Sequence, residues 1–394
     1  MNNKKFLKTA GIFLLILNLI LFNNFSMNYS FASNFVYTEP ISIKTEIISD
    51  ETVNYAKSIY TKHLISLIDA NEINGDLNEF SLGNSFNLYN VKTKTHSSCF
   101  TIIYKNSIVA ILEVYKDNNE FSSSLSKSFS DELNTLLTYN TQNIDDFFLL
   151  TDGVNLQAFD GVNSVKIYEL YENENSEDLG KLFTKNTKIQ NKVNHSKLIE
   201  PIKSSDSLGI SPVARPILQH QNSILDLNQI TTTSLIEPFE GKTINVRGVS
   251  QGDHDWCWAA TTAAMINFYK GYSLKASNIA KYVFPKNPDQ GGYWKDMKKA
   301  YNHWGLYPKQ TGIIGFNSVM YNINKNKPMH LGLKGHSVGL IGYRKWIDEY
   351  GGSRILVLLE PNGGVRKSVT LKSNNNFNYE LGGGTNAWIY TREF

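Results

Sequence analysis

The stretch Gln251–Ala260, QGDHDWCWAA, decides the interpretation of the C-terminal part of this chain. An apolar pattern with helical spacing, including Ala260 and Phe268, follows it and stops at Gly271. The pattern predicts that Cys257 lies at the start of a helix. Unpaired backbone N–H groups and the positive end of the helix dipole favour a thiolate there, and the thiolate is the reactive form of cysteine.

Two later segments carry the polar groups that a nucleophilic cysteine requires. Gly335–Ser337, GHS, precedes the apolar run VGLIGY, which predicts a buried strand with His336 at its start. From that position the imidazole can act as general base and form an ion pair with the Cys257 thiolate. The run Ile355–Leu359, ILVLL, predicts another strand and leads into Glu360–Gly364, EPNGG. A polar group at that strand end can orient the imidazole.

Gln251 lies six residues before Cys257, close enough for its side-chain amide to hold an oxyanion together with a backbone N–H of the helix start. The whole pattern, from this Gln and Cys-Trp to the Gly-His strand, resembles the papain-like cysteine peptidases over about residues 243 to 394. It is most similar to secreted bacterial branches: staphopains, bacteriocin-processing peptidases, and plant-pathogen effector proteases that share the WCWAA stretch. The resemblance implies Gln251 in the oxyanion hole, Cys257 as nucleophile and His336 as base.

The resemblance also implies a fold and leaves one catalytic position open. The family has a helical half that bears the Cys and a β-barrel-like half that bears the His, with substrate in the cleft between them. Relatives end the third strand in Asn or Asp, often before Pro. An ungapped alignment places Glu360 there, with Pro361 behind it, whereas Asn362 has the residue type of the papain pattern two positions later. Both residues share one strand parity, so the strand face does not choose between them. We favour Glu360, which the ungapped alignment places there, and keep Asn362 as the alternative.

Other histidines and the second cysteine offer competing interpretations. His330 lies in the apolar run PMHLGL, and His254 lies on the loop before the nucleophile, so each is a rival for the base. Cys99 lies in a strand-like run and is predicted to be an inert core residue. A disulfide from Cys99 to Cys257 that silences a zymogen is the alternative.

Aromatic spacing after the nucleophile predicts further core. Trp294, Met297, Tyr301 and Trp304 fall at helical spacing and are expected to be buried rather than to contact substrate. The preceding loop, Asn287–Gly292, either borders the cleft or is a simple turn. No C-x-x-C or H-E-x-x-H spacing occurs, so we expect neither a metal nor another cofactor.

The first thirty-two residues have the layout of a signal peptide. Lys4, Lys5 and Lys8 form a positive segment, Ala10–Phe22 is apolar, and Ser30-Phe31-Ala32 predicts cleavage after Ala32. An uncleaved N-terminal anchor is the alternative. We therefore expect a secreted protein, with attachment to the cell surface as a second possibility and no stable membrane association after cleavage.

The residues between the signal peptide and the C-terminal domain divide into two segments. Residues 33–171 are predicted to form an α+β pro-region, and 172–241 a linker and activation segment rich in Asn, Lys, Ser and Glu. Within the pro-region we expect helices at 51–68 and 129–137, strands at 99–104, 107–115, 147–151 and 165–171, and turns at Lys105-Asn106, Asp152-Gly153 and Asp160-Gly161.

Together these patterns predict an α+β fold whose domain at 242–394 is a papain-like cysteine endopeptidase made as a zymogen. The expected partners are a protein or peptide substrate and the chain's own pro-region as an intramolecular inhibitor. A net charge of +3 without a basic cluster argues against a nucleic-acid partner. Cell-wall amidases, acyltransferases of the transglutaminase type and a non-catalytic surface-binding protein are the alternatives.

Overall fold

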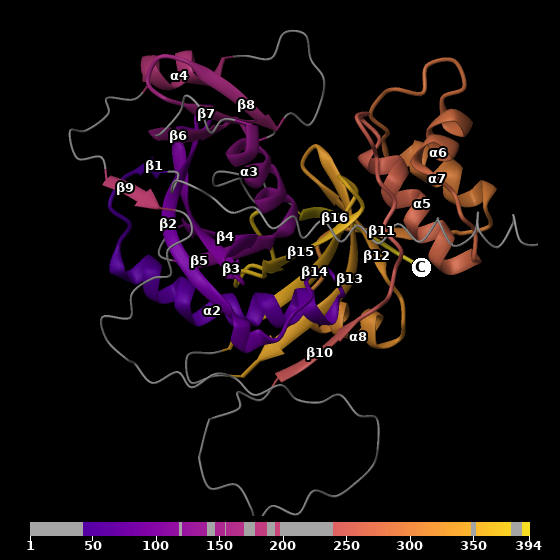
Figure 1. Cartoon of the computed structure of the whole chain (residues 1–394). Coiled ribbons are helices and arrows are strands. Elements are labelled where there is room, and N and C mark those ends of the chain that lie inside the picture. Colours follow the sequence, from indigo (N-terminus) through magenta and orange to yellow (C-terminus); the bar gives the residue numbers. More distant parts are fainter. Residues whose placement is uncertain are drawn as a thin grey trace, which may run out of the picture. The chain divides into compact units, whose positions relative to one another are not determined.

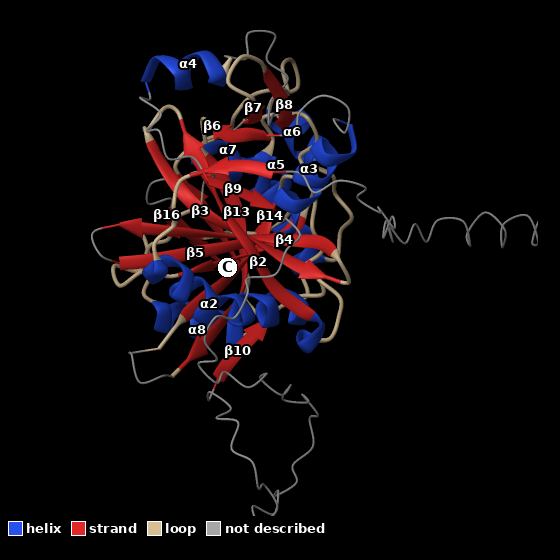
Figure 2. Ribbon diagram, turned by 60° about the vertical axis from the view of Figure 1, so that its left-hand side comes forward, coloured by secondary structure: helices blue, strands red, loops and turns tan. Residues whose placement is uncertain are grey.

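The computed structural model describes residues 42–117, 120–139, 146–153, 155–168, 178–186, 194–197, 239–347, 352–379 and 388–394. The predicted signal peptide and most of the predicted linker lie outside these residues. The fold is α+β, as predicted, and the described residues belong to one compact unit. Both the N-terminal and the C-terminal part contain helices and strands (Figures 1 and 2). None of the helices in these ranges is long and apolar enough to cross a membrane.

The N-terminal part is built on an antiparallel set of strands covered by helix α2 (Asp50–Asp69). The strands are β2 (Phe80–Asn90), β3 (Thr95–Tyr104), β4 (Ser107–Asp117) and β5 (Glu120–Ser126), each paired with the next. The predicted hairpin at Lys105 and Asn106 is present. Both residues have positive φ, 49° and 62°, the conformation that a two-residue hairpin turn of matching twist requires.

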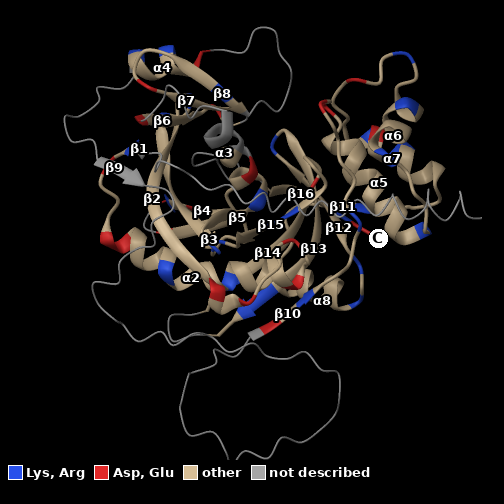
Figure 3. Ribbon diagram, in the orientation of Figure 1, with Lys and Arg blue, Asp and Glu red and all other residues tan. Residues whose placement is uncertain are grey.

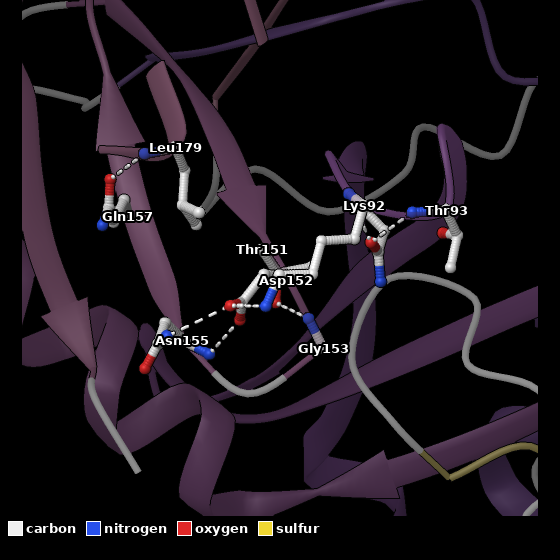
Figure 4. A network of polar contacts seen from close by, with 9 residues as sticks. Lys92, Thr93, Thr151, Asp152, Gly153, Asn155, Gln157 and Leu179 are labelled. Atoms are coloured by element: carbon white, nitrogen blue, oxygen red, sulfur yellow. Dashed lines mark hydrogen bonds and ion pairs between the residues drawn. The ribbon is translucent and has the colours of Figure 1, made fainter. Parts of the chain in front are cut away.

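Shorter elements continue this part of the chain. They are β1 (Ser42–Thr45), the 3-10 helix η1 (Leu77–Glu79), α3 (Lys127–Tyr139), β6 (Asp146–Thr151), β7 (Leu156–Phe159) and β8 (Ser164–Tyr168). The predicted turn at Asp152 joins β6 to β7, and its carboxylate accepts hydrogen bonds from Lys92 Nζ at 2.7 Å and from Asn155 N at 2.8 Å (Figure 4). Strand β7 was not predicted, because its four residues are all buried and show no alternation.

Two elements fall inside the segment predicted as linker. Helix α4 (Leu179–Asn186) buries Leu179 and Phe183 against Phe148 and Phe159, and strand β9 (Asn194–Lys197) pairs with β1. The Leu179 N–H donates to Gln157 Oε1 at 3.0 Å (Figure 4). The helix was not predicted because the segment is mostly polar and only two of its apolar side chains, Leu179 and Phe183, anchor α4.

The C-terminal part combines a group of helices with an antiparallel sheet. Helices α5 (Cys257–Lys270), α6 (Ala276–Val283) and α7 (Trp294–His303) pack on one another, and α5 also packs on strand β13. The remaining elements are β10 (Phe239–Thr243), β11 (Lys309–Thr311), α8 (Phe316–Asn324), β12 (Met329–Leu333), β13 (His336–Trp346), β14 (Arg354–Glu360), β15 (Val365–Thr370) and β16 (Trp388–Glu393).

One hydrogen-bonded path of strands runs through both parts. In the C-terminal part the order is β11-β16-β12-β13-β14-β15, and β15 then pairs antiparallel with β5 through Lys367↔Ser126 and Val369↔Ser124. The buried His63 of α2 bridges the junction, with Nδ1 2.8 Å from Ser368 Oγ and Nε2 2.9 Å from Ser123 Oγ. Strand β15 is therefore not a free edge that would invite pairing with other chains.

Charged contacts also cross this junction. Arg344 Nη2 donates to Asp69 Oδ2 at 3.0 Å, and Lys372 Nζ lies 3.3 Å from Asp117 Oδ2. Elsewhere the described Lys and Arg residues are interspersed with Asp and Glu along the ribbon (Figure 3).

Candidate active site

Helix α5 presents Cys257 at its first residue, as the sequence predicts. The preceding residue, Trp256, gives no side-chain cap, so the first backbone N–H groups of the helix remain available to another acceptor. The helix ends at Gly271, whose φ of 70° is the left-handed conformation that commonly closes helices. The Cys257 side chain is partly exposed, while the alanines that follow it are buried. The core thus fixes the helix and leaves its first side chain accessible.

His336 opens strand β13 and faces both Cys257 and Glu360. Its Nε2 lies 3.0 Å from Glu360 Oε1 and 3.3 Å from Oε2, and its side chain is 15% exposed. Cys257 is also a side-chain hydrogen-bond partner of the ring. Because Nε2 faces the carboxylate, Nδ1 is the nitrogen left for the thiol. The three side chains form a chain of contacts in the order nucleophile, imidazole, carboxylate.

The environment of His336 favours its charged form. Burial lowers the pKa of the ring, but the Glu360 carboxylate and the hydrogen bond with Cys257 raise it more, and the resulting pKa is about 10. At neutral pH the imidazole is therefore protonated. A protonated ring beside the cysteine stabilises a thiolate by direct charge attraction.

The strand end after Ile355 resolves into two positions with different contacts. Glu360 is the last residue of β14, is 9% exposed and contacts the His336 ring through both carboxylate oxygens. Asn362 donates its backbone N–H to Glu360 Oε1 at 2.9 Å. These contacts bring Glu360, the favoured residue, to the imidazole and bring the backbone N–H of Asn362 to the carboxylate.

Gln251 lies in the loop that leads into α5 and is tied to the Glu360 strand end. Its backbone N–H donates to Pro361 O at 2.8 Å, and its side chain is buried, with 2% exposed. The side-chain Nε2 donates to His254 O at 3.1 Å, and Trp256 N donates to the same carbonyl at 2.7 Å. One amide hydrogen of Gln251 remains for a further acceptor.

The two rival histidines have other surroundings. His330 lies fully buried in β12, with Nδ1 2.7 Å from Tyr301 Oη, and burial lowers its pKa well below the usual value. His254 stacks on Trp256 at 3.9 Å between ring centroids, and its Nδ1 lies 3.1 Å from Asp289 Oδ2. Among the described residues, the partners of these rings are Tyr301 for His330, and Trp256 and Asp289 for His254.

The tryptophans on both sides of Cys257 hold the loop at 287–292. Trp256 Nε1 donates to Pro288 O at 2.6 Å, and Trp258 Nε1 donates to Gln290 O at 3.0 Å. A Cβ at Gly292 would come within 2.4 Å of the Trp258 ring, so only glycine fits there without a shift. The loop therefore lies next to the nucleophile, which favours the first of the two interpretations that the sequence left open.

The second cysteine belongs to a different region. Cys99 is fully buried in β3, where burial raises its pKa well above the usual value, and both cysteines are free thiols. The structure has no Cys99–Cys257 disulfide. Among the described residues there is no group of three or more His, Cys, Asp or Glu side chains that could hold a metal ion.

Comparison with known families bears on the same part of the chain. Residues 243–385 match the model of the Peptidase_C39 like family, a family of cysteine peptidases. The match supports cysteine peptidase activity for this part of the chain. It includes Cys257, His336, Glu360 and Gln251. No curated protein matches the chain. The narrower likeness to staphopains remains a prediction.

Proposed function

We propose that the C-terminal part of this chain is a cysteine endopeptidase that hydrolyses peptide bonds through an acyl-enzyme on Cys257. One observation carries the proposal: His336 contacts the thiol on one side and lies 3.0 Å from the Glu360 carboxylate on the other. Nucleophile, base and orienting group in this order are the arrangement that activates a thiol for acyl transfer.

The steps follow from the contacts. The Cys257 thiolate attacks the scissile carbonyl carbon, and the oxyanion accepts hydrogen bonds from Gln251 Nε2 and the backbone N–H at the start of α5. Protonated His336 then gives its proton to the leaving amine as the C–N bond breaks. Neutral His336 next takes a proton from water, which attacks the thioester and releases the carboxylic acid and the thiolate.

Glu360 and Gln251 act through position. The carboxylate accepts from His336 Nε2 and keeps Nδ1 directed at Cys257, and it is itself held by the Asn362 backbone N–H at 2.9 Å. The bond from Gln251 N to Pro361 O links the oxyanion-binding loop to the same strand end. Both supports reduce the reorganisation that the reaction requires.

Secretion and a zymogen form are also part of the proposal. The signal-peptide pattern at 1–32 supports export, and the polar stretch within 172–241 supports cleavage between the two parts. Pairing of β5 with β15 and the His63 bridge support a pro-region that folds with the enzyme. The inhibitory role of the pro-region rests on the resemblance to secreted papain-like zymogens.

The test compares secreted wild-type protein with Cys257→Ala by mass spectrometry, with and without a thiol-directed epoxide. Cys99→Ala is the matched control, because that thiol is fully buried and lies outside the site. Wild type and Cys99→Ala should take one label, at Cys257, and yield a species that begins between residues 200 and 242. Full-length, unlabelled material from wild type as well as from Cys257→Ala would contradict the proposal.

A further inference from the structure

Arg392 of β16 is a buried cation, and two of its three guanidinium nitrogens have no acceptor among the described residues. Arg392 is 3% exposed, and its Nε and Nη1 atoms are buried without a hydrogen-bond partner among the described residues. A buried charge without a partner costs several kcal/mol, and arginine does not escape by losing its proton. An anion that binds there would recover this cost.

Arg344 of β13 is a second buried arginine, and its hydrogen-bond partners differ from those of Arg392. Arg344 is also 3% exposed, but its Nη2 donates to Asp69 Oδ2 at 3.0 Å and its Nη1 to Tyr343 O at 2.7 Å. The described structure thus supplies an internal carboxylate for one guanidinium and none for the other. The difference indicates that the partner of Arg392 comes from outside these residues.

The groups around Arg392 are aromatic or neutral. The Trp294 ring centroid lies 5.1 Å from the guanidinium carbon, and His330 is the residue opposite Arg392 in the strand pairing. His330 is uncharged, since burial lowers its pKa well below the usual value, and its Nε2 has no partner among the described residues. Among the described residues Arg392 therefore has the Trp294 ring beside it but forms no ion pair with a carboxylate.

The guanidinium points along β12 toward the catalytic end of the sheet. Arg392 pairs with His330, yet a Cβ at Gly332 would lie 3.1 Å from its Nη1 and 3.4 Å from its Nη2. Gly332 in turn pairs with Ser337, the neighbour of His336. Strands β12 and β16 lie side by side in Figure 1. A single glycine thus leaves room for the cation one residue pair from His336. Because adjacent pairs of a strand ladder put their side chains on opposite faces, the guanidinium shares the face of Ser337 and Gly339, where a Cβ at Gly339 would meet Met265 of α5.

The other wall belongs to α7, which packs on the helix α5 that carries the nucleophile. Trp294 begins α7 directly after the loop that Trp256 and Trp258 hold against the start of α5. Tyr390 shares the strand face of Arg392, lies with its Cβ beside Gly332, and is 46% exposed, so this region reaches the surface. The guanidinium lies between Trp294 of α7, a helix that packs on α5, and Gly332 of β12, a strand that pairs with β13.

We infer that Arg392 determines specificity by binding the carboxylate of an acidic side chain in the peptide substrate, at a residue close to the scissile bond. This inference rests on the proposed peptidase function. A carboxylate matches the guanidinium in charge and hydrogen-bonding geometry, and the Trp294 ring is an apolar wall for the methylene groups of Asp or Glu. An amide side chain of the same shape would leave the charge uncompensated.

The experiment uses peptide pairs that differ only in Glu against Gln at each of the three positions on either side of the cleaved bond. For wild type, kcat/KM should favour Glu by about 10-fold or more at one position. Arg392→Gln should bring that ratio to about one, and Arg392→Lys should retain part of it. Gly332→Ala keeps the charge but displaces it, and should lower the ratio while the Gln peptide is still cleaved. Arg344→Gln, the matched control, should leave the ratio unchanged.

A second measurement separates this inference from the proposed function. Affinities of the Glu and Gln peptides for the Cys257→Ala protein do not require hydrolysis. A Glu preference in binding without cleavage by wild type would support Arg392 and reject the peptidase. Equal affinities, or an unchanged preference in Arg392→Gln, would overturn the inference. A further outcome is that chloride raises the thermal stability of wild type but not of Arg392→Gln, with no preference for the Glu peptide. That result would identify an inorganic anion as the ligand of Arg392 and would also overturn the inference.

Discussion

His330 and His336 lie on neighbouring antiparallel strands, and at neutral pH the first ring is uncharged and the second is protonated. His330 is fully buried in β12 beside Tyr301, and burial lowers its pKa well below the usual value. His336 begins β13 with its side chain 15% exposed, and burial lowers its pKa too, but Glu360 and Cys257 raise it to about 10. Burial acts on both rings in the same direction, so the difference comes from their neighbours: Glu360 and Cys257 raise the pKa of His336, whereas the Arg392 charge lowers that of His330 further.

The comparison separates a histidine that contributes to the proposed reaction from one that contributes to packing. A neutral ring held by a tyrosine hydroxyl fills the sheet and stabilises it. A ring between a thiol and a carboxylate can carry a proton between reacting groups. The same residue type six positions earlier in the sequence is therefore no substitute for His336.

The largest expected effect comes from making His336 resemble His330 by Glu360→Gln. Loss of the carboxylate charge removes the main group that raises the pKa of His336, so kcat/KM should fall on the order of 100-fold. In wild type the protonated ring is lost as pH rises through about 10, so activity should decline there. In Glu360→Gln this alkaline decline should move to lower pH.

The sign of the accompanying stability change is fixed by the direction of the shift. The folded-state pKa of His336, about 10, exceeds the ordinary value of 6.5. Its contribution to folding is therefore complete below about pH 6.5 and is lost as pH rises through about 10. The measurements are pH–rate profiles and urea unfolding of both proteins. An unchanged alkaline limb in Glu360→Gln would show that Glu360 does not set the charge of the ring.

Parts of the fold and of the candidate site could be predicted from local sequence. Cys257 as a helix start, His336 as a strand start and the turn at Lys105-Asn106 each depend on a few adjacent residues. Strand parity could not decide between Glu360, the favoured residue, and Asn362, because both have the same parity. The choice depends on how the chain turns after β14, so that the Asn362 backbone N–H points back at the carboxylate.

Other features depend on residues that are distant in sequence. Helix α4 forms inside a polar segment because Phe183 meets Phe148 and Phe159. Arg392 has no sequence signal, since one arginine in a short strand is ordinary. Only the pairing of β16 with β12 shows that it is buried beside Gly332.

A smaller effect is expected on the His330 side, from Tyr301→Phe. The fully buried hydroxyl lies 2.7 Å from His330 Nδ1, and its loss leaves that nitrogen unpaired. The free energy of unfolding should fall by about 1–3 kcal/mol, while kcat/KM of the folded enzyme stays within about twofold. Urea unfolding measures the first and peptide hydrolysis the second. Tyr307→Phe, at a residue that is 78% exposed, is the control and should change neither.

The pH dependence of this region has the opposite sign to that of His336. Because burial lowers the folded-state pKa of His330 below 6.5, its contribution to folding is complete above about pH 6.5 and is lost as pH falls. The free energy of unfolding should therefore decrease from pH 7 to pH 5. If kcat/KM of folded Tyr301→Phe falls by much more than twofold, the two histidines are coupled, and His330 contributes to the reaction as well as to packing.

The smallest effect is expected from Asn362→Ala, which separates the two residues that the sequence left open. The bond from residue 362 to Glu360 Oε1 comes from the backbone N–H, so alanine retains it. We expect kcat/KM to change by less than about threefold, against the much larger loss in Glu360→Gln. The double variant should be no worse than Glu360→Gln alone. If Asn362→Ala instead loses activity as strongly as Glu360→Gln, the asparagine side chain shares the orienting role, and the carboxylate alone does not explain why His336 differs from His330.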